Sequence, residues 1–415
     1  MPASSQEPPI EAEGPADPSS ELSSGEELRR QMARQLLSRV AGAPLVPGNR
    51  IELLLDAREN YPAWKQAIAA AGRSVHFEMY IVHDDPVGRD FAELLARKAR
   101  EGVRVRVLYD WLGNLGKASR RLWRRLEGAG VEVRVFNPFR FTSPLGWIRR
   151  DHRKVVAVDG KVAFVSGLCV GQAWEGRPER GIPGWRDTGV RLEGPAVADV
   201  ERAFAECWAR AGRPLAEDEH PVAAEPGGGG QLVRVIAGSP DTAGLLRLDL
   251  LWAAAARRRL WITDAYFVGT PSYLDALRGA ARARVDVRLL VPGASDVRLV
   301  ATLTRAQYRS LLEAGVRVFE WNGPMLHAKS AVVDGRWARV GSTNLNLASW
   351  IGNWEIDVCV EDEAFAGDLE AAFLRDLRGA TEIVLRTPAA TRPHRLRGEP
   401  RPRVVEADDE PRPSA

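Results

Sequence analysis

The feature that most constrains the fold of this chain is a short polar sequence motif, a phrase of eight residues that occurs twice with the same internal spacing. Both copies read His-x-Lys-x4-Asp, the first from His152 to Asp159 and the second from His327 to Asp334. A step of small residues follows each copy at the same distance, Ser166-Gly167 in one case and Gly341-Ser342 in the other. Because the chain holds only six histidines, this match indicates a tandem duplication rather than chance.

The strand and helix patterns repeat with the phrase. The strands expected in the first half are 51–55, 75–82, 103–109 and 131–136, and those expected in the second half are 232–237, 260–267, 285–291 and 316–321. The helices expected between them are 61–71, 88–100, 117–129, 245–256, 272–283 and 300–314. Such alternation is typical of a mixed sheet covered by helices, so the expected fold class is α/β, with two pseudo-symmetric halves.

Composition divides the chain into five segments. Residues 1–25 and 387–415 are rich in Pro and charged or small side chains and are expected to be disordered tails. A Gly-rich connector at 211–230 separates a first half at 26–210, which opens with a helix over 26–40, from a second half at 231–386.

Charge and cysteine content argue against several classes of protein. The formal net charge of +3 does not favour a protein that coats nucleic acid, so no nucleic-acid partner is expected. Three scattered cysteines fit neither a disulfide framework nor a zinc site, so we expect a reducing compartment, no metal and no other cofactor. No apolar run approaches the roughly 20 residues that cross a bilayer, so any action on membranes is expected from the surface.

The residue types of the phrase suit phosphoryl transfer. A His and a Lys two positions apart on a strand face the same side and can address one anionic group together. One neutral imidazole can attack phosphorus, a second can pass a proton to the leaving alcohol, and lysines can stabilise the non-bridging oxygens. The candidate catalytic residues are therefore His152, Lys154, Asp159, His327, Lys329 and Asp334.

The two motif aspartates are expected to lie away from the chemistry. Each is five residues beyond its Lys, which places Asp159 and Asp334 more than about 15 Å along an extended strand. We expect them to anchor the turns at Asp159-Gly160 and Asp334-Gly335.

These paired motifs resemble the twin HKD signature of the phospholipase D superfamily, over roughly residues 45 to 385. The second copy continues with Gly341-Ser342-Thr343-Asn344 and Asn353-Trp354-Glu355, which is similar to the downstream pattern of that family. Cys169 stands where the first copy would carry an asparagine. Within the superfamily, phrases such as His76-Phe77-Glu78-Met79-Tyr80 and Trp185-Arg186-Asp187-Thr188 resemble bacterial cardiolipin synthases, here without transmembrane helices.

The resemblance implies one active site at the interface of the halves. Repeat alignment makes Asp187 and Glu355 equivalents, and the family implies that each carboxylate orients the imidazole of the opposite half, Glu355 with His152 and Asp187 with His327. Supporting or phosphate-binding roles are expected for Asn344, Ser342 and Ser166.

The activity that the resemblance implies is a transphosphatidylase that makes cardiolipin through a phosphohistidine. By family habit His152 is the nucleophile and His327 the acid and base, and the reverse assignment stays open. The expected partners are phosphatidylglycerol and the membrane surface, with the protein cytoplasmic and peripheral to the inner face of the cell membrane. A hydrolytic phospholipase D, a nuclease on the same fold and a non-catalytic lipid-binding protein are the alternatives, and the oligomeric state is open.

One difference between the halves lies just before the first motif, where the first half carries about ten extra residues. This insertion lies within 137–151 and mixes the apolar residues Phe139, Phe141, Trp147 and Ile148 with Arg140, Arg149 and Arg150. Two interpretations stay open. The apolar side chains either enter the interface of an anionic membrane or pack the loop itself.

Overall fold

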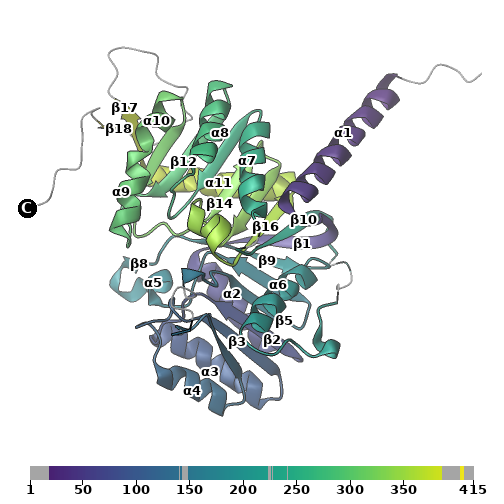
Figure 1. The fold of residues 1–415 in the computed structure, drawn as a ribbon, viewed down its shortest axis with the longest axis vertical. Helices are drawn as coiled ribbons and strands as arrows, with labels where there is room; N and C mark the ends of the chain where they lie inside the picture. The colour runs from purple at the N-terminus through teal and green to yellow at the C-terminus, as the bar shows by residue number, and fades with distance from the viewer. Residues whose placement is uncertain are drawn as a thin grey trace, which may run out of the picture.

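A computed structural model describes residues 18–139, 141–142, 148–222, 226, 228–240, 242–385 and 402–405 (Figure 1). Residues 1–17 and most of 387–415, where tails are expected, lie outside this part of the chain, as do Arg140 and Trp147 of the insertion. Two stretches of the expected tails differ from the prediction. Helix α1 (Pro18–Ala41) begins eight residues before Glu26, and Pro402–Val405 form strand β18, which pairs with β17. Ser and Glu near a helix N-terminus favour helix without any core contact, so composition alone is a poor guide there.

The strands form one mixed sheet of 16 strands in which each half supplies one side. The first half contributes β1 (Val46–Leu55), β2 (Ser74–Met79), β3 (Arg104–Asp110), β4 (Glu132–Phe136), β5 (Lys154–Val158), β6 (Val162–Ser166) and β9 (Thr188–Glu193). The second half contributes β10 (Gln231–Gly238), β11 (Arg259–Thr263), β12 (Asp286–Pro292), β13 (Arg317–Trp321), β14 (Ser330–Val333), β15 (Trp337–Gly341), β16 (Glu355–Glu361) and β17 (Ala380–Leu385). A separate hairpin joins β7 (Gly176–Arg177) to β8 (Ile182–Pro183).

The order of the strands confirms the duplication. From the centre outward the first half runs β1-β9-β6-β5-β2-β3-β4, and the second runs β10-β16-β15-β14-β11-β12-β13 before β17 and β18. In both halves the three strands 2-3-4 or 11-12-13 are parallel, and the motif strand, β5 or β14, runs antiparallel to them. The halves meet where β1 pairs antiparallel with β10, with Val46 opposite Val233.

Helices cover both faces of this sheet (Figure 1). They are α2 (Asp56–Ala70), α3 (Pro86–Arg100), α4 (Arg120–Gly128), α5 (Gln172–Glu175) and α6 (Val197–Arg210) in the first half, and α7 (Gly244–Ala255), α8 (Pro271–Arg282), α9 (Arg298–Ala306), α10 (Tyr308–Glu313) and α11 (Glu363–Arg378) in the second. A central apolar cluster joins the halves, with Val165 and Val200 of the first packed in one core with Val340 and Phe373 of the second. The two halves therefore pack against each other through a shared core rather than forming independent domains.

Local sequence signals explain where several helices begin. Asp85 caps α3 by accepting a hydrogen bond of 3.0 Å from the Gly88 N–H, and Pro86 occupies the first helical position. Ser119 caps α4 in the same way, through the Leu122 N–H at 3.1 Å. The expected helix 300–314 is instead divided at Gln307, whose side chain binds both backbone groups of Gly269.

Three other features position the site. The expected strands 75–82 and 260–267 end early, at Met79 and Thr263, because the chain turns there into loops that line the site. The connector packs on the first half, where Glu219 accepts hydrogen bonds from Arg104 at 2.6 Å and Arg106 at 2.8 Å. In the part of the chain that the structure describes, no helix is both long and apolar enough to pass through a bilayer.

Candidate active site

The two motif copies meet at the interface of the halves. His152 and His327 lie just before β5 and β14, at the end of the sheet where the parallel strands finish. The halves then exchange backbone hydrogen bonds, from the His152 N–H to the Trp354 oxygen at 2.9 Å and from the His327 N–H to the Arg186 oxygen at 2.7 Å. Each histidine is thereby docked beside the residue that precedes the carboxylate of the other half.

The first imidazole is held by a glutamate from the second half. Nδ1 of His152 lies 2.9 Å from Oε2 of Glu355, and both side chains are buried. The hydroxyl of Ser342 donates to the same oxygen at 2.6 Å and accepts from the Ile356 N–H at 2.9 Å. A carboxylate at Nδ1 fixes the tautomer and leaves Nε2 for chemistry.

The second imidazole is held by an aspartate from the first half. Nδ1 of His327 lies 2.7 Å from Oδ2 of Asp187. The indole N–H of Trp174, on α5, donates to this oxygen at 3.0 Å, and the Thr188 N–H donates to Oδ1 at 2.8 Å. A Cβ at Gly167 would stand 2.2 Å from Oδ1 of Asp187, so only glycine leaves room for the carboxylate.

The two lysines are fully buried beside their histidines. Nζ of Lys154 donates to the His152 oxygen at 2.5 Å, and Nζ of Lys329 donates to the His327 oxygen and lies 3.0 Å from Nδ1 of that ring. Aromatic rings line both pairs, since Nζ of Lys154 is 5.0 Å from the ring of Tyr80 and Nζ of Lys329 is 5.6 Å from the ring of Tyr266. Burial lowers the pKa of Lys154, and it lowers that of Lys329 to about 8.

The imidazoles are neutral and their partners are ionised at neutral pH. Burial lowers the pKa of both His152 and His327 from 6.5 to about 4. Burial alone would raise the pKa of Glu355 and of Asp187, but the neighbouring His and Lys groups outweigh burial and lower the pKa of both carboxyl groups. A neutral imidazole is the form that attacks phosphorus, and an anionic substrate would favour protonation of its neighbour.

The motif aspartates lie at the far ends of the motif strands. Asp159 accepts hydrogen bonds from the N–H groups of residues 72–74, and Asp334 accepts from those of residues 257–259. Both residues have a positive φ, 57° and 54°. The structure thus places them in turns and does not bring them to the histidines.

Two expected supporting residues fall in different surroundings. Ser166 is not brought to the site, because its hydroxyl accepts from the Leu168 N–H at 3.2 Å. Counted from the histidines, Ser342 corresponds to Gly167 and Ser166 to Gly341, so the prediction for Ser166 was one position out of register. Asn344 is buried in the loop after β15, and its amide lies 3.4 Å from the hydroxyl of Ser349.

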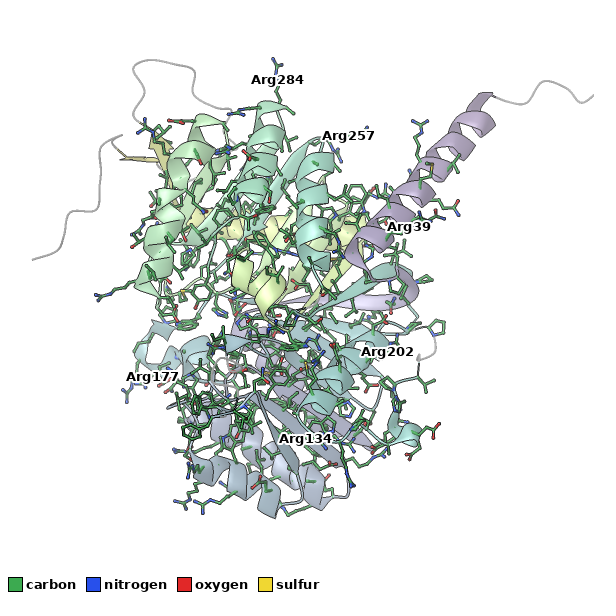
Figure 2. The ribbon with its side chains drawn as sticks, viewed as in Figure 1. Arg39, Arg134, Arg177, Arg202, Arg257 and Arg284 are labelled. Atoms are coloured by element: carbon green, nitrogen blue, oxygen red, sulfur yellow. The ribbon has the colours of Figure 1, made fainter. Side chains whose placement is uncertain are left out.

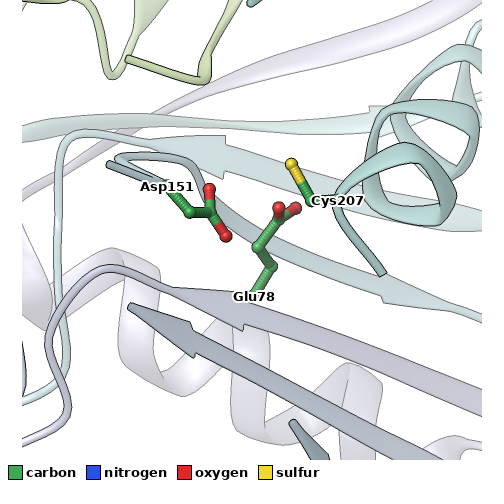
Figure 3. A group of neighbouring side chains, drawn as sticks. All are labelled: Glu78, Asp151 and Cys207. Carbon is green, nitrogen blue, oxygen red and sulfur yellow. The ribbon is translucent and has the colours of Figure 1, made fainter. Parts of the chain in front are cut away.

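Some residues of the site have no signal in the repeated phrase. Tyr80 follows the strand that pairs with Lys154, so its position at a strand end could have indicated it. Trp174 lies on α5, whose counterpart in the second half is the short π-helix Ala348–Gly352, and the repeated motif itself does not point to Trp174. Among the described residues, one group of side chains has metal-ligand spacing, formed by Glu78, Asp151 and Cys207 (Figure 3).

Comparison with known proteins agrees with this geometry. The family described as "Cardiolipin synthase, PLD-like domain" matches residues 64–173 and 253–377. The cardiolipin synthase of Halalkalibacterium halodurans is 34% identical over 364 residues, which cover 85% of this chain and 71% of that protein. Cardiolipin synthase A of Pseudomonas fluorescens is 35% identical over 354 residues, which cover 82% of this chain and 71% of that protein.

A solved structure shares the fold. The phosphatidylserine synthase of Haemophilus influenzae superposes with a TM-score of 0.61 at 15% identity, over 83% of this chain and 90% of that chain. The family match covers both halves, and the relatives align along most of their own length. The chain therefore belongs to the cardiolipin synthase family built on the phospholipase D-like domain.

Proposed function

We propose that this chain is a cardiolipin synthase that transfers a phosphatidyl group to phosphatidylglycerol through a phosphohistidine. The observation that carries the proposal is the meeting of two carboxylate-oriented imidazoles, one from each half, in a single buried site with two lysines. A transfer through a covalent intermediate needs two such groups, one to hold phosphorus and one to move protons.

In the first step, Nε2 of His152 attacks the phosphorus of the donor lipid. A P–N bond forms, the P–O bond to the leaving alcohol breaks, and His327 in its protonated form donates a proton to that alcohol. In the second step, the hydroxyl of phosphatidylglycerol gives its proton to His327 and attacks phosphorus, which breaks the P–N bond and frees His152. Lys154 and Lys329 stabilise the charge on the non-bridging oxygens in both steps.

The surroundings of the two rings support this division of roles. Nζ of Lys329 lies 3.0 Å from Nδ1 of His327. A cation so close makes the imidazolium of His327 a readier proton donor, which suits the group that protonates a leaving alcohol. Nζ of Lys154 donates to the backbone oxygen of His152, 2.5 Å away, as Lys329 does to that of His327, so the contact of Lys329 with the ring nitrogen is what distinguishes the two lysines.

A product assay tests the proposed function. Purified protein is incubated with phosphatidylglycerol, alone and together with phosphatidylethanolamine, and the lipids are identified by mass spectrometry. Cardiolipin is expected in at least one mixture and is expected to be absent with the H152A variant. Phosphatidic acid without cardiolipin would contradict the transfer reaction and identify a hydrolase.

We also propose that the protein acts as a peripheral enzyme at the inner, cytoplasmic face of the cell membrane. Exposed apolar side chains extend from the sheet end that carries the histidines, with Phe141 92% exposed after β4 and Leu299 69% exposed after β12. Arg149 and Arg298 are exposed beside them and suit anionic headgroups. The three cysteines are free and buried, which supports a reducing compartment.

Vesicle sedimentation tests this surface. The double variant F141S/L299S is expected to bind phosphatidylglycerol vesicles at least about tenfold more weakly, because each side chain loses apolar burial. The matched control is M32S, which changes a residue 61% exposed on α1. Weaker binding by M32S alone would place the contact on α1 and contradict a membrane surface around the site.

Arginines lie on many different elements of the molecule. The labelled arginines in Figure 2 come from α1, α6, β4, β7 and two loops of the second half, on both sides of the interface. Arg134 is among them, and its guanidinium stacks 3.8 Å over Trp208 instead of facing outward. These six side chains therefore do not form one basic surface.

A further inference from the structure

A buried ionisable cluster lies directly behind the first motif. Glu78 at the end of β2, Asp151 before His152, Arg153 and Cys207 on α6 are all fully buried. Figure 3 shows the carboxylate of Glu78 between that of Asp151 and the sulfur of Cys207. The proposed reaction uses none of these four side chains.

Three of the four oxygens of the two carboxylates lack donors. Both oxygens of Glu78 and Oδ2 of Asp151 are buried with no hydrogen-bond partner among the described residues. The ligand atoms of Glu78, Asp151 and Cys207 all lie within 4.8 Å of one another. Two ionised carboxylates at this spacing would repel each other without water to screen them, whereas one shared proton satisfies both.

The cluster fits a proton better than a metal ion. Nη1 of Arg153 lies 3.2 Å from Sγ of Cys207, so a fixed cation already adjoins the space where a metal would bind. Burial raises the pKa of Cys207, which keeps the thiol protonated and able to donate weakly to Glu78. One positive guanidinium balances one negative charge, which leaves the second carboxyl group to be neutralised by a proton.

We propose that Glu78 and Asp151 hold one proton between them and that this pair, together with Arg153, positions His152 against Glu355. The shared proton does not depend on the proposed function. The positioning of His152 for catalysis does rest on the proposed function. Glu78 and Asp151 are positioning residues in this scheme, since neither touches the reacting atoms.

Arg153 is the group that transmits the position. Its guanidinium donates to three backbone oxygens, those of Glu355 at 3.1 Å, Gly238 at 3.0 Å and Ala203 at 2.5 Å. These contacts tie β16, β10 and α6 to the motif. Asp151 accepts from the Arg153 N–H at 3.2 Å. The residue that precedes His152 and the residue that follows it are therefore held in one network.

The charged groups that face the pair come from several elements. They are Arg153, Asp110 at the end of β3, whose Oδ2 accepts from the Asp151 N–H at 3.0 Å, and Glu206 on α6, which lies 3.2 Å from Arg153. Burial raises the pKa of Glu78 and of Asp151, in agreement with a retained proton. Burial also raises the pKa of Asp110, to about 6.

Infrared spectroscopy of the full chain tests the shared proton directly. Wild-type protein at neutral pH is expected to show the carbonyl stretch of protonated carboxylic acids, and the part of this band that comes from the pair is expected to vanish in the difference spectra of E78Q and of D151N. The control is E382Q, which removes a buried carboxylate paired with Arg317 at 2.8 Å and should leave the band intact. A band of unchanged intensity in both E78Q and D151N would overturn the proposal.

Thermal unfolding gives a second readout. A raised folded-state pKa means that stability is lost as pH rises above the ordinary carboxyl pKa of about 4 toward the raised value, so the wild-type melting temperature should fall as pH rises over that range. E78Q supplies a permanent amide donor to Asp151 and should flatten this slope, with the contribution of Asp110 remaining. Parallel slopes, or a stoichiometric metal ion that E78Q loses, would contradict a shared proton.

Kinetics separates positioning from simple stability. E78Q is expected to keep kcat within about threefold of wild type, while E78A lowers kcat more than about tenfold with KM little changed. Equal kcat in wild type and folded E78A would overturn the positioning role. Because E78A removes buried atoms and can fail to fold, the infrared result for E78Q decides the question independently. A wild-type protein that shows the acid band but makes no cardiolipin would sink the proposed function and leave the shared proton standing.

Discussion

The two half-sites orient their imidazoles in the same way but with different residues. In one, His152 is held by Glu355, whose carboxylate is supported by the short hydroxyl of Ser342. In the other, His327 is held by the shorter Asp187, which is supported by the long indole of Trp174. The comparison shows that the duplication conserves the distance from carboxylate to imidazole and not the residues that fix it.

The surroundings behind the two motifs differ more strongly. Asp151 and Arg153 flank the first histidine and belong to a buried charged cluster, whereas the corresponding Leu326 and Ala328 flank the second and belong to the apolar core. The first imidazole therefore sits on a polar scaffold that ties four elements together. Its neighbour sits on close-packed side chains, so the two rings are unequal before any substrate binds.

The largest effect that would break the comparison comes from the histidines themselves. H152A and H327A are each expected to lower kcat by about 10⁴-fold or more. With a donor whose leaving alcohol needs little protonation, H327A should accumulate labelled phosphoenzyme, and H152A should not. Label on His327 in the H152A variant would reverse the assignment of the nucleophile.

The next effect comes from the orienting carboxylates. E355Q and D187N keep the shape of each side chain but remove the charge, and each should lower kcat by about 10²- to 10⁴-fold through loss of the correct tautomer. KM should change far less than kcat in both variants. A loss confined to one variant would show that only one imidazole needs its carboxylate.

A smaller effect sharpens the difference between Ser342 and Gly167. G167A forces a Cβ to within 2.2 Å of Oδ1 of Asp187, and the overpacking should cost about 1–3 kcal/mol and lower kcat by about 10- to 100-fold. S342A removes one donor to Glu355 and should cost about 1 kcal/mol, or roughly fivefold in kcat. Equal losses in the two variants would contradict the steric account of Gly167.

The smallest effect is the pH dependence. A pKa of about 4 for His152 and His327, below the ordinary 6.5, means that the folded state binds fewer protons than the unfolded chain in this window. Stability from these groups is complete above about pH 6.5 and is lost as pH falls toward 4. The double variant H152N/H327N should lose less stability over that range in thermal melts, and an unchanged acid slope would count against burial of neutral imidazoles.

Much of this arrangement is predictable from the sequence because it is local or repeated. The register of the two motifs and the alignment of Asp187 with Glu355 follow from the spacing of residues along the sequence alone. The repeat does not support the expectation for Ser166, because Gly167 occupies the position equivalent to Ser342 and the hydroxyl of Ser166 accepts from the Leu168 N–H. Strand ends at Met79 and Thr263 were missed because apolar runs continue into the loops of the site.

Other contacts of the site cannot be predicted from a sequence pattern. Glu78 and Asp151 meet only because β2 and β5 are neighbours in the sheet, and each alone is an ordinary acidic residue. Trp174 reaches Asp187 from α5, whereas Trp350, on the short π-helix Ala348–Gly352 at the corresponding place of the second half, donates to Asp249. Such contacts depend on tertiary geometry, which composition and periodicity do not encode.

The pairing of β1 with β10 joins the strands of both halves in one sheet across the interface. In two identical halves related by an exact dyad, only the orientation of the bound lipid would decide which ring holds phosphorus and which moves protons. Joining the halves in one chain allows each side to change its support without changing the other. The roles of the two rings can then be fixed by the protein before the lipid binds.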